Sequence, residues 1–132
     1  TTYNNTATEA GGNWSTAGVD AIEIMNTGNA NCSLNISSNK NAADLLGGTN
    51  PAFQWNISNN EANSCINVSV GQLGTFADVN KTTAGYFCSN FSFHDTRDTI
   101  IVDALIRVPN DLNSSIIGIE QTATLTFLCT ST

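Results

Sequence analysis

Hydrophobic and polar residues alternate along most of this chain, and the alternation predicts β-strands. In the stretch 31–37, Cys32, Leu34 and Ile36 share one parity, while the intervening asparagines and serines share the other. A period of two puts the apolar set on one face of a strand and the polar set on the other. We therefore expect a strand here with one buried face and one face in water.

The same pattern recurs in further short segments that are separated by turn residues. Apolar residues at alternate positions are expected to point inward, for example Ile66, Val68 and Val70, or Phe87, Phe91 and Phe93. A single helical turn is expected at 41–47, where Gly47 would end it. The predicted strands cover residues 19–25, 31–37, 53–58, 65–70, 76–79, 86–93, 99–108 and 121–129.

Seven or eight short strands without a long amphipathic helix predict an all-β fold. We expect a two-sheet antiparallel sandwich of immunoglobulin-like or jelly-roll type, formed as a single domain by residues 1–132. Residues 1–18 read as an N-terminal extension or edge strand, and residues 19–132 as the sandwich core.

Charge narrows the possible partners of this domain. Charged residues make up 11% of the chain, the net charge is −7, and the basic residues Lys40, Lys81, Arg97 and Arg107 are scattered. Nucleic-acid binding requires a basic patch that neutralises phosphates, so no nucleic-acid partner is expected. No apolar run reaches the ~20 residues of a membrane span. The polar start suggests a mature product whose leader has been removed.

The four cysteines suggest two disulfides. Cys32 and Cys129 share the inward parity of their strands, whereas Cys65 and Cys88 share the outward parity. Matching faces favours the pairs 32–129 and 65–88 over the two other pairings, and over free buried thiols. Disulfides persist in oxidising compartments, so an extracellular or cell-surface location is expected.

N-glycosylation sequons are abundant, and those within predicted strands fall on outward positions. Several are expected to carry N-linked glycans, with Asn35, Asn56, Asn67 and Asn90 foremost. The nine candidate sites are Asn4, Asn13, Asn31, Asn35, Asn56, Asn67, Asn80, Asn90 and Asn113.

One polar segment, His94–Asp98, could carry chemistry. His94 could act as a base oriented by Asp95 or Asp98, or these aspartates with Asp111 could bind calcium. Without a nucleophile motif or a paired-carboxylate motif, we interpret the segment as a polar loop. We expect no enzyme activity, no metal and no cofactor.

Some outward positions are apolar. Ile101 and Leu105 lie in the outward phase of strand 99–108, Leu128 lies in that of strand 121–129, and Ile116 belongs to an isoleucine-rich stretch. A barrel-like corner, a covered second face or a surface buried against another copy of the chain would each explain them.

Two segments resemble immunoglobulin-like surface domains of secreted archaeal and bacterial proteins. These segments are residues 19–29, which end in Met-Asn-Thr-Gly-Asn, and residues 98–127, which resemble the closing hairpin of such domains. In size and sequon density the chain is also similar to subunits of archaeal extracellular filaments, which assemble when one subunit lends a strand to the next.

That second resemblance implies a structural subunit of a glycosylated extracellular filament or surface coat, with copies of itself as partners. Residues 1–12 are the expected donor strand, with Tyr3, Thr6 and Ala7 as fillers. The surface around Ile101, Leu105 and Ile116 is the expected supporting contact. The alternative is a secreted module that binds carbohydrate or a cell surface, with Trp14, Tyr3 and Tyr86 as its sugar platform.

Overall fold

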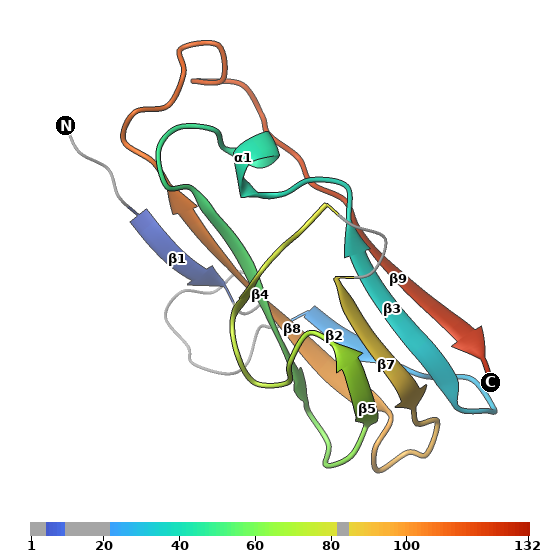
Figure 1. Ribbon diagram of the computed structural model, residues 1–132. Helices are drawn as coiled ribbons and strands as arrows, with labels where there is room; N and C mark the ends of the chain where they lie inside the picture. Colours follow the sequence, from blue (N-terminus) through green and yellow to red (C-terminus); the bar gives the residue numbers. More distant parts are fainter. Residues whose placement is uncertain (1–4, 10–21, 82–84) are drawn as a thin grey trace.

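Nine strands and one short helix are present in residues 5–9, 22–81 and 85–132, the part of the chain that the computed structural model describes (Figure 1). The elements are β1 Asn5–Glu9, β2 Ile22–Met25, β3 Cys32–Ser38, α1 Ala42–Leu45, β4 Ala52–Asn59, β5 Cys65–Val70, β6 Ala77–Asp78, β7 Tyr86–Phe91, β8 Thr99–Val108 and β9 Leu125–Ser131.

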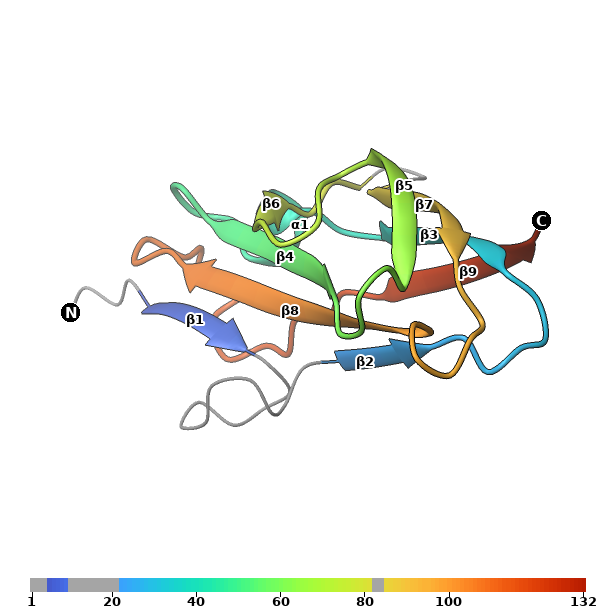
Figure 2. The same cartoon turned by 90° about the horizontal axis from the view of Figure 1, so that it is seen from below.

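The strands form two antiparallel sheets that pack face to face (Figure 2). One sheet has the order β1-β8-β4-β6, with β2 also paired to β8, and the other has the order β5-β7-β3-β9. The predicted all-β antiparallel sandwich is confirmed. Each connection from β2 to β9 crosses from one sheet to the other. Strands β8 and β9 therefore lie in different sheets, and the closing segment is not the hairpin that the sequence resemblance implied.

One edge of the first sheet is built from two strand pieces. Strand β1 pairs with the second half of β8, from Asn5 opposite Val108 to Glu9 opposite Ala104. Strand β2 pairs with the first half of β8, beginning with Ile22 opposite Val102. Strand β1 brings the strand count to nine, one more than the eight predicted segments, and the two-residue β6 lies within the predicted segment 76–79. Within the expected extension 1–18, only residues 5–9 are described, and they form an edge strand.

The core lies between the sheets and contains large side chains from both. Trp55 of β4 is 3% exposed, Tyr86 and Phe91 of β7 are each 1% exposed, and Ile36 of β3 is fully buried. Gly85 permits this packing, because a Cβ at that position would lie 2.4 Å from Cζ2 of Trp55. The predicted inward positions in residues 31–37 and 53–58 are correct.

Strand phases in β5 and β7 differ from the prediction because bulges interrupt the alternation. In β7, two residues (Ser89 and Asn90) lie opposite the single residue Ser33 of β3, so both Cys88 and Phe91 point into the core. A bulge shifts the side chains beyond it to the other face. The predicted inward position of Phe87 is therefore wrong.

In β5, Cys65 is buried while Ile66 is exposed, which reverses the predicted phase. The backbone of Asn67 has a φ of 58°, and the β5–β7 register shifts between Val68 and Val70. Val68 packs against the core, as predicted, but Val70 is 40% exposed.

Two boundary predictions have different outcomes. The helical turn is confirmed as α1, with the side chain of Asn41 accepting a hydrogen bond from the backbone N–H of Asp44, and Gly47 following at a φ of 64°. The last strand begins later than predicted, at Leu125. Just before it, Thr124 and Asn39 are joined by two hydrogen bonds, one of them from the Thr124 backbone N–H to the Asn39 side chain.

Candidate assembly edge and modification sites

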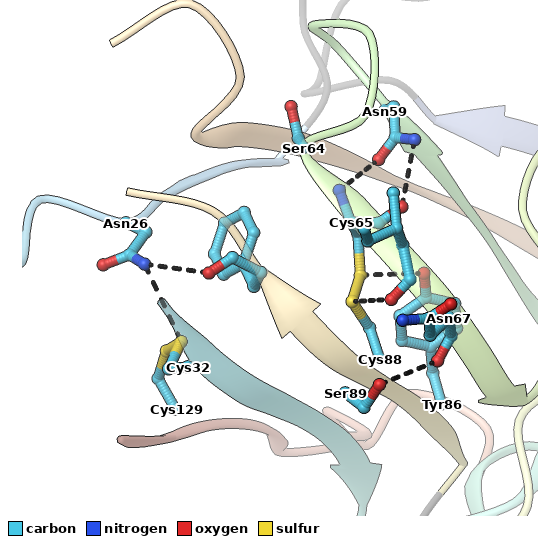
Figure 3. The surroundings of a disulfide bond; sticks show 12 residues. Asn26, Cys32, Asn59, Ser64, Cys65, Asn67, Tyr86, Cys88, Ser89 and Cys129 are labelled. Atoms are coloured by element: carbon cyan, nitrogen blue, oxygen red, sulfur yellow. Dashed lines mark hydrogen bonds between the residues drawn. A yellow bond between two sulfur atoms is a disulfide. The ribbon is translucent and has the colours of Figure 1, made fainter. Parts of the chain in front are cut away.

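Two disulfides join neighbouring strands of the β5-β7-β3-β9 sheet (Figure 3). Cys32 of β3 is bonded to Cys129 of β9 with 5.5 Å between Cα atoms, and Cys65 of β5 to Cys88 of β7 with 6.1 Å. The structure contains the two predicted pairs, but the predicted faces are only partly right. Cys65 and Cys88 are buried in the core, although they were expected to point outward. Cys32 and Cys129 have the predicted inward face: Cys32 is buried, and Cys129 lies opposite the buried Leu34, although it is exposed on the edge strand β9.

The Cys65–Cys88 disulfide has polar partners within the core. The hydroxyl of Tyr86 donates a hydrogen bond to Sγ of Cys65 at 3.5 Å. Burial of Tyr86 disfavours its charged form and raises its pKa to about 12. The side chain of Asn59 accepts from the Cys65 N–H at 2.8 Å and donates to the Cys65 carbonyl at 3.2 Å, which joins the end of β4 to the start of β5 (Figure 3).

Seven of the nine sequon asparagines lie in the described part of the chain, and none of these seven is fully buried. Asn4 and Asn13 lie outside the described residues. The side chain of Asn31 accepts a hydrogen bond from the Phe93 N–H at 3.3 Å, that of Asn113 accepts one from the Ser115 N–H at 3.0 Å, and the backbone of Asn67 has a positive φ. The exposed members are Asn67, Asn80 and Asn113, and the half-buried members are Asn31, Asn35, Asn56 and Asn90.

Asn56 has an acidic neighbour on the outer face of the first sheet. It lies opposite Asp103 in the β4–β8 register, and Oδ1 of each residue is inaccessible to water and has no hydrogen-bond partner among the described residues. Desolvation raises the pKa of Asp103. A carboxylate here lacks compensating donors, whereas a protonated Asp103 would have a hydrogen to donate.

The residues expected to form a subunit interface are only partly brought together. Ile101 and Leu105 are half-buried on the same face of β8, on either side of Asp103. Ile116 lies apart from them in the connection between β8 and β9, close to Gly47. Thr6 and Ala7 belong to β1 and pair with Arg107 and Ile106 of β8, while Tyr3 is outside the described residues.

The His94–Asp98 segment is a turn between β7 and β8. His94 is exposed, and its ring stacks on that of Phe93 with 4.5 Å between centroids. Asp98, by contrast, is buried, and its side chain accepts a hydrogen bond from the Thr99 hydroxyl at 2.9 Å. Within the described ranges, no group of three or more His, Cys, Asp or Glu side chains is positioned to hold a metal ion.

A search of this chain against protein-family profiles, curated proteins and solved structures finds no significant match in any of the three. Within residues 5–9, 22–81 and 85–132, no helix has the length and apolar character needed to cross a membrane.

Proposed function

We propose that this protein is a structural subunit of an extracellular, glycosylated filament whose subunits exchange their N-terminal strand. In the free chain, β1 occupies the second half of the β8 edge. In the filament, β1 of one subunit takes that position on β8 of the next.

The divided edge of the first sheet is the observation that carries the proposal. Strand β1 pairs only with β8, along residues 104–108, and its other edge has no strand partner among the described residues. Strand β2 separately holds the first half of β8. Strand β1 can therefore leave the domain while β2, β8 and β4 stay paired, and the vacated backbone groups of β8 would accept an identical strand in the same register.

Burial along β8 supports exchange at this half. Thr99, Ile100 and Val102 are buried where β8 pairs with β2, whereas each residue from Asp103 to Val108 is only half-buried. Because this half of β8 is already partly exposed while β1 is paired with it, the departure of β1 exposes less buried surface than the departure of β2 would.

The ends of the sandwich suit a linear arrangement. Strand β1 begins at the end where β8 finishes, and β9 ends at the opposite end of the domain (Figure 1). The connection that follows β8 carries Ile117 and Ile119, which are 63% and 60% exposed. Exposed isoleucines at one end are suited to an end-to-end contact with another subunit.

Engineered cysteines distinguish exchange from self-pairing. Thr6 and Arg107 are directly opposite in the β1–β8 register, so the double variant Thr6→Cys, Arg107→Cys should form a disulfide. In assembled material we expect that disulfide to link different chains and to give a ladder on non-reducing gels, with the junction identified by peptide mass spectrometry. The matched control is Glu23→Cys, Ile101→Cys across β2 and β8, which should link within one chain in every state.

Deletion of residues 1–9 provides the complementary test. The truncated chain should remain a folded, soluble monomer and should not form filaments. If the two cysteines introduced at positions 6 and 107 are linked only within single chains in assembled material, β1 is excluded as the exchanged strand. A full-length native protein that is monomeric at all concentrations would favour the carbohydrate- or surface-binding module instead.

The aromatic residues give that alternative less support. Trp55 and Tyr86 are both buried in the core, so neither offers a stacking face to a sugar from solution. Trp14 and Tyr3 lie outside the described residues.

A further inference from the structure

An apolar row crosses the outer face of the β5-β7-β3-β9 sheet and contains a sequon asparagine. Asn35 of β3 lies directly opposite Leu128 of β9 on one side and Phe87 of β7 on the other, and Phe87 in turn lies opposite Val70 of β5. Leu128 is 56% exposed and Val70 is 40% exposed, while Phe87 and Asn35 are half-buried. We call Leu128, Asn35, Phe87 and Val70 the outer row.

The outward positions that flank the outer row on β3 and β9 are polar, and Ile66 of β5 is a separate exposed apolar residue on this face. Along β3, the outward neighbours of Asn35 are Ser33 and Ser37, and these lie opposite Thr130 and Thr126 of β9. Among the asparagines that the β-ladders place opposite a neighbouring strand, Asn56 faces Asp103 and Asn90 faces Ile66. In these registers of the described strands, Asn35 alone has a large apolar residue opposite it on both sides.

We propose that the first sugars of an N-linked glycan on Asn35 lie against Phe87 and Leu128 and cover the outer row. The inference rests on the glycosylation that is part of the proposed function, but it does not depend on polymerisation. Directly opposite residues in an antiparallel pair have Cβ atoms about 4.5–5.5 Å apart, so a sugar attached to the Asn35 amide starts within reach of both neighbours. The C–H faces of a pyranose ring are apolar and carry partial positive charge, which suits the negative face of an aromatic ring.

This arrangement also gives the outer row a permanent cover. A leucine and a valine that are about half exposed on a sheet face lose contact with water when an attached glycan lies over them, and burial of apolar area stabilises the state in which it occurs. Because the glycan is covalently attached at the centre of the row, no second molecule has to be recruited.

The test compares two sequon deletions that leave both asparagines in place. Ser37→Ala removes the Asn35 sequon, and Ser69→Ala removes the Asn67 sequon on the same sheet, where the backbone carbonyl of Asn67 accepts a hydrogen bond from the Ser89 hydroxyl. Both proteins are produced in the native host and their occupancy is checked by site-resolved mass spectrometry. We expect Ser37→Ala to lower the melting temperature by about 3 °C or more, and Ser69→Ala to change it by less than about 1 °C.

A second comparison separates glycan contact from ordinary cross-strand packing. Phe87→Thr is measured with and without Ser37→Ala, and the outer-row contact predicts that Phe87→Thr costs more in melting temperature when the glycan is present. In nuclear magnetic resonance spectra, protons of the first sugar should be shifted upfield by the Phe87 ring, and Phe87→Leu should abolish that shift.

Strict additivity of the two substitutions, together with unshifted sugar protons, would overturn the proposal. An unoccupied Asn35 on native protein would also overturn it. If the outer row is instead protected from solvent only in assembled material, another copy of the chain is its cover and the glycan is not. The melting temperatures, the sugar proton shifts and the occupancy of Asn35 can all be measured on unassembled protein, so failure here is distinguishable from failure of the strand-exchange proposal.

Discussion

Removing the Cys65–Cys88 disulfide should destabilise the domain, and the effect of Tyr86→Phe on the free energy of unfolding should change when the disulfide is absent. The perturbation is the double variant Cys65→Ala, Cys88→Ala. Both sulfur atoms lie in the core, since the two cysteines are 1% and 0% exposed, and Sγ of Cys65 is the acceptor for the Tyr86 hydroxyl. The substitution therefore opens a closed loop and also removes the hydrogen-bond acceptor of a buried phenol.

Two contributions set the expected magnitude. The sequence separation of 23 residues corresponds to about 3.4 kcal/mol in the chain-entropy model of disulfide stabilisation. Leaving the buried Tyr86 hydroxyl without an acceptor costs about 1–3 kcal/mol more. The sum of about 4–6 kcal/mol is a large part of the roughly 5–15 kcal/mol that stabilises a typical domain.

The assay is urea unfolding followed by tryptophan fluorescence, with the free energy of unfolding extrapolated to water. Adding Tyr86→Phe completes a double-mutant cycle. In the native background it removes a hydrogen bond and should cost about 1 kcal/mol, whereas in the double-alanine background it removes an unpaired hydroxyl and should be neutral or stabilising. A loss below about 2 kcal/mol for the double-alanine variant, or an equal cost of Tyr86→Phe in both backgrounds, would refute the reasoning.

Gly85, the titration of Tyr86, and Asp103 give further tests. Gly85→Ala should destabilise the fold by about 3 kcal/mol in urea unfolding, because the added methyl group would meet the Trp55 indole at 2.4 Å. Burial raises the pKa of Tyr86 from 10.0 to about 12, so the stability linked to its neutral form should be lost as the pH rises from 10 towards 12, and Tyr86→Phe should weaken this alkaline dependence. Burial also raises the pKa of Asp103 above 3.8, so its contribution is most favourable below that pH and is lost as the pH rises through the raised value. Asp103→Asn should therefore raise the melting temperature at pH 7 but not at pH 3, and an increase of equal size at both would contradict the assignment.

The bounds of β5 and β8 agree with the predictions because each is a strand whose limits are set by its own residues and flanking turns. Residues 65–70 and 99–108 form strands as predicted. The helical turn at 41–47 was also predictable, since an asparagine cap and a terminating glycine act through local hydrogen bonding and backbone freedom.

The faces of β5 and β7 could not be read from the alternation. The extra residue at Ser89–Asn90 and the positive φ of Asn67 depend on how neighbouring strands align, and each reverses the parity on which the prediction relied. The cysteine pairing was nevertheless predicted correctly, because Cys65 and Cys88 changed face together and a parity match survives when both partners are reversed.

The sequence by itself determined the fold class and the cysteine pairs, and it placed the sequon asparagines at positions that are not fully buried where the structure describes them. These properties follow from a period of two and from local turn chemistry. Only the tertiary structure decided that β1 and β2 divide one edge of β8, that Phe87 and Leu128 flank Asn35, and that Asp103 lies opposite Asn56. Those relations join residues far apart in the chain through sheet register. Register is fixed by the packing of whole faces and by bulges, and no short stretch of sequence contains that information.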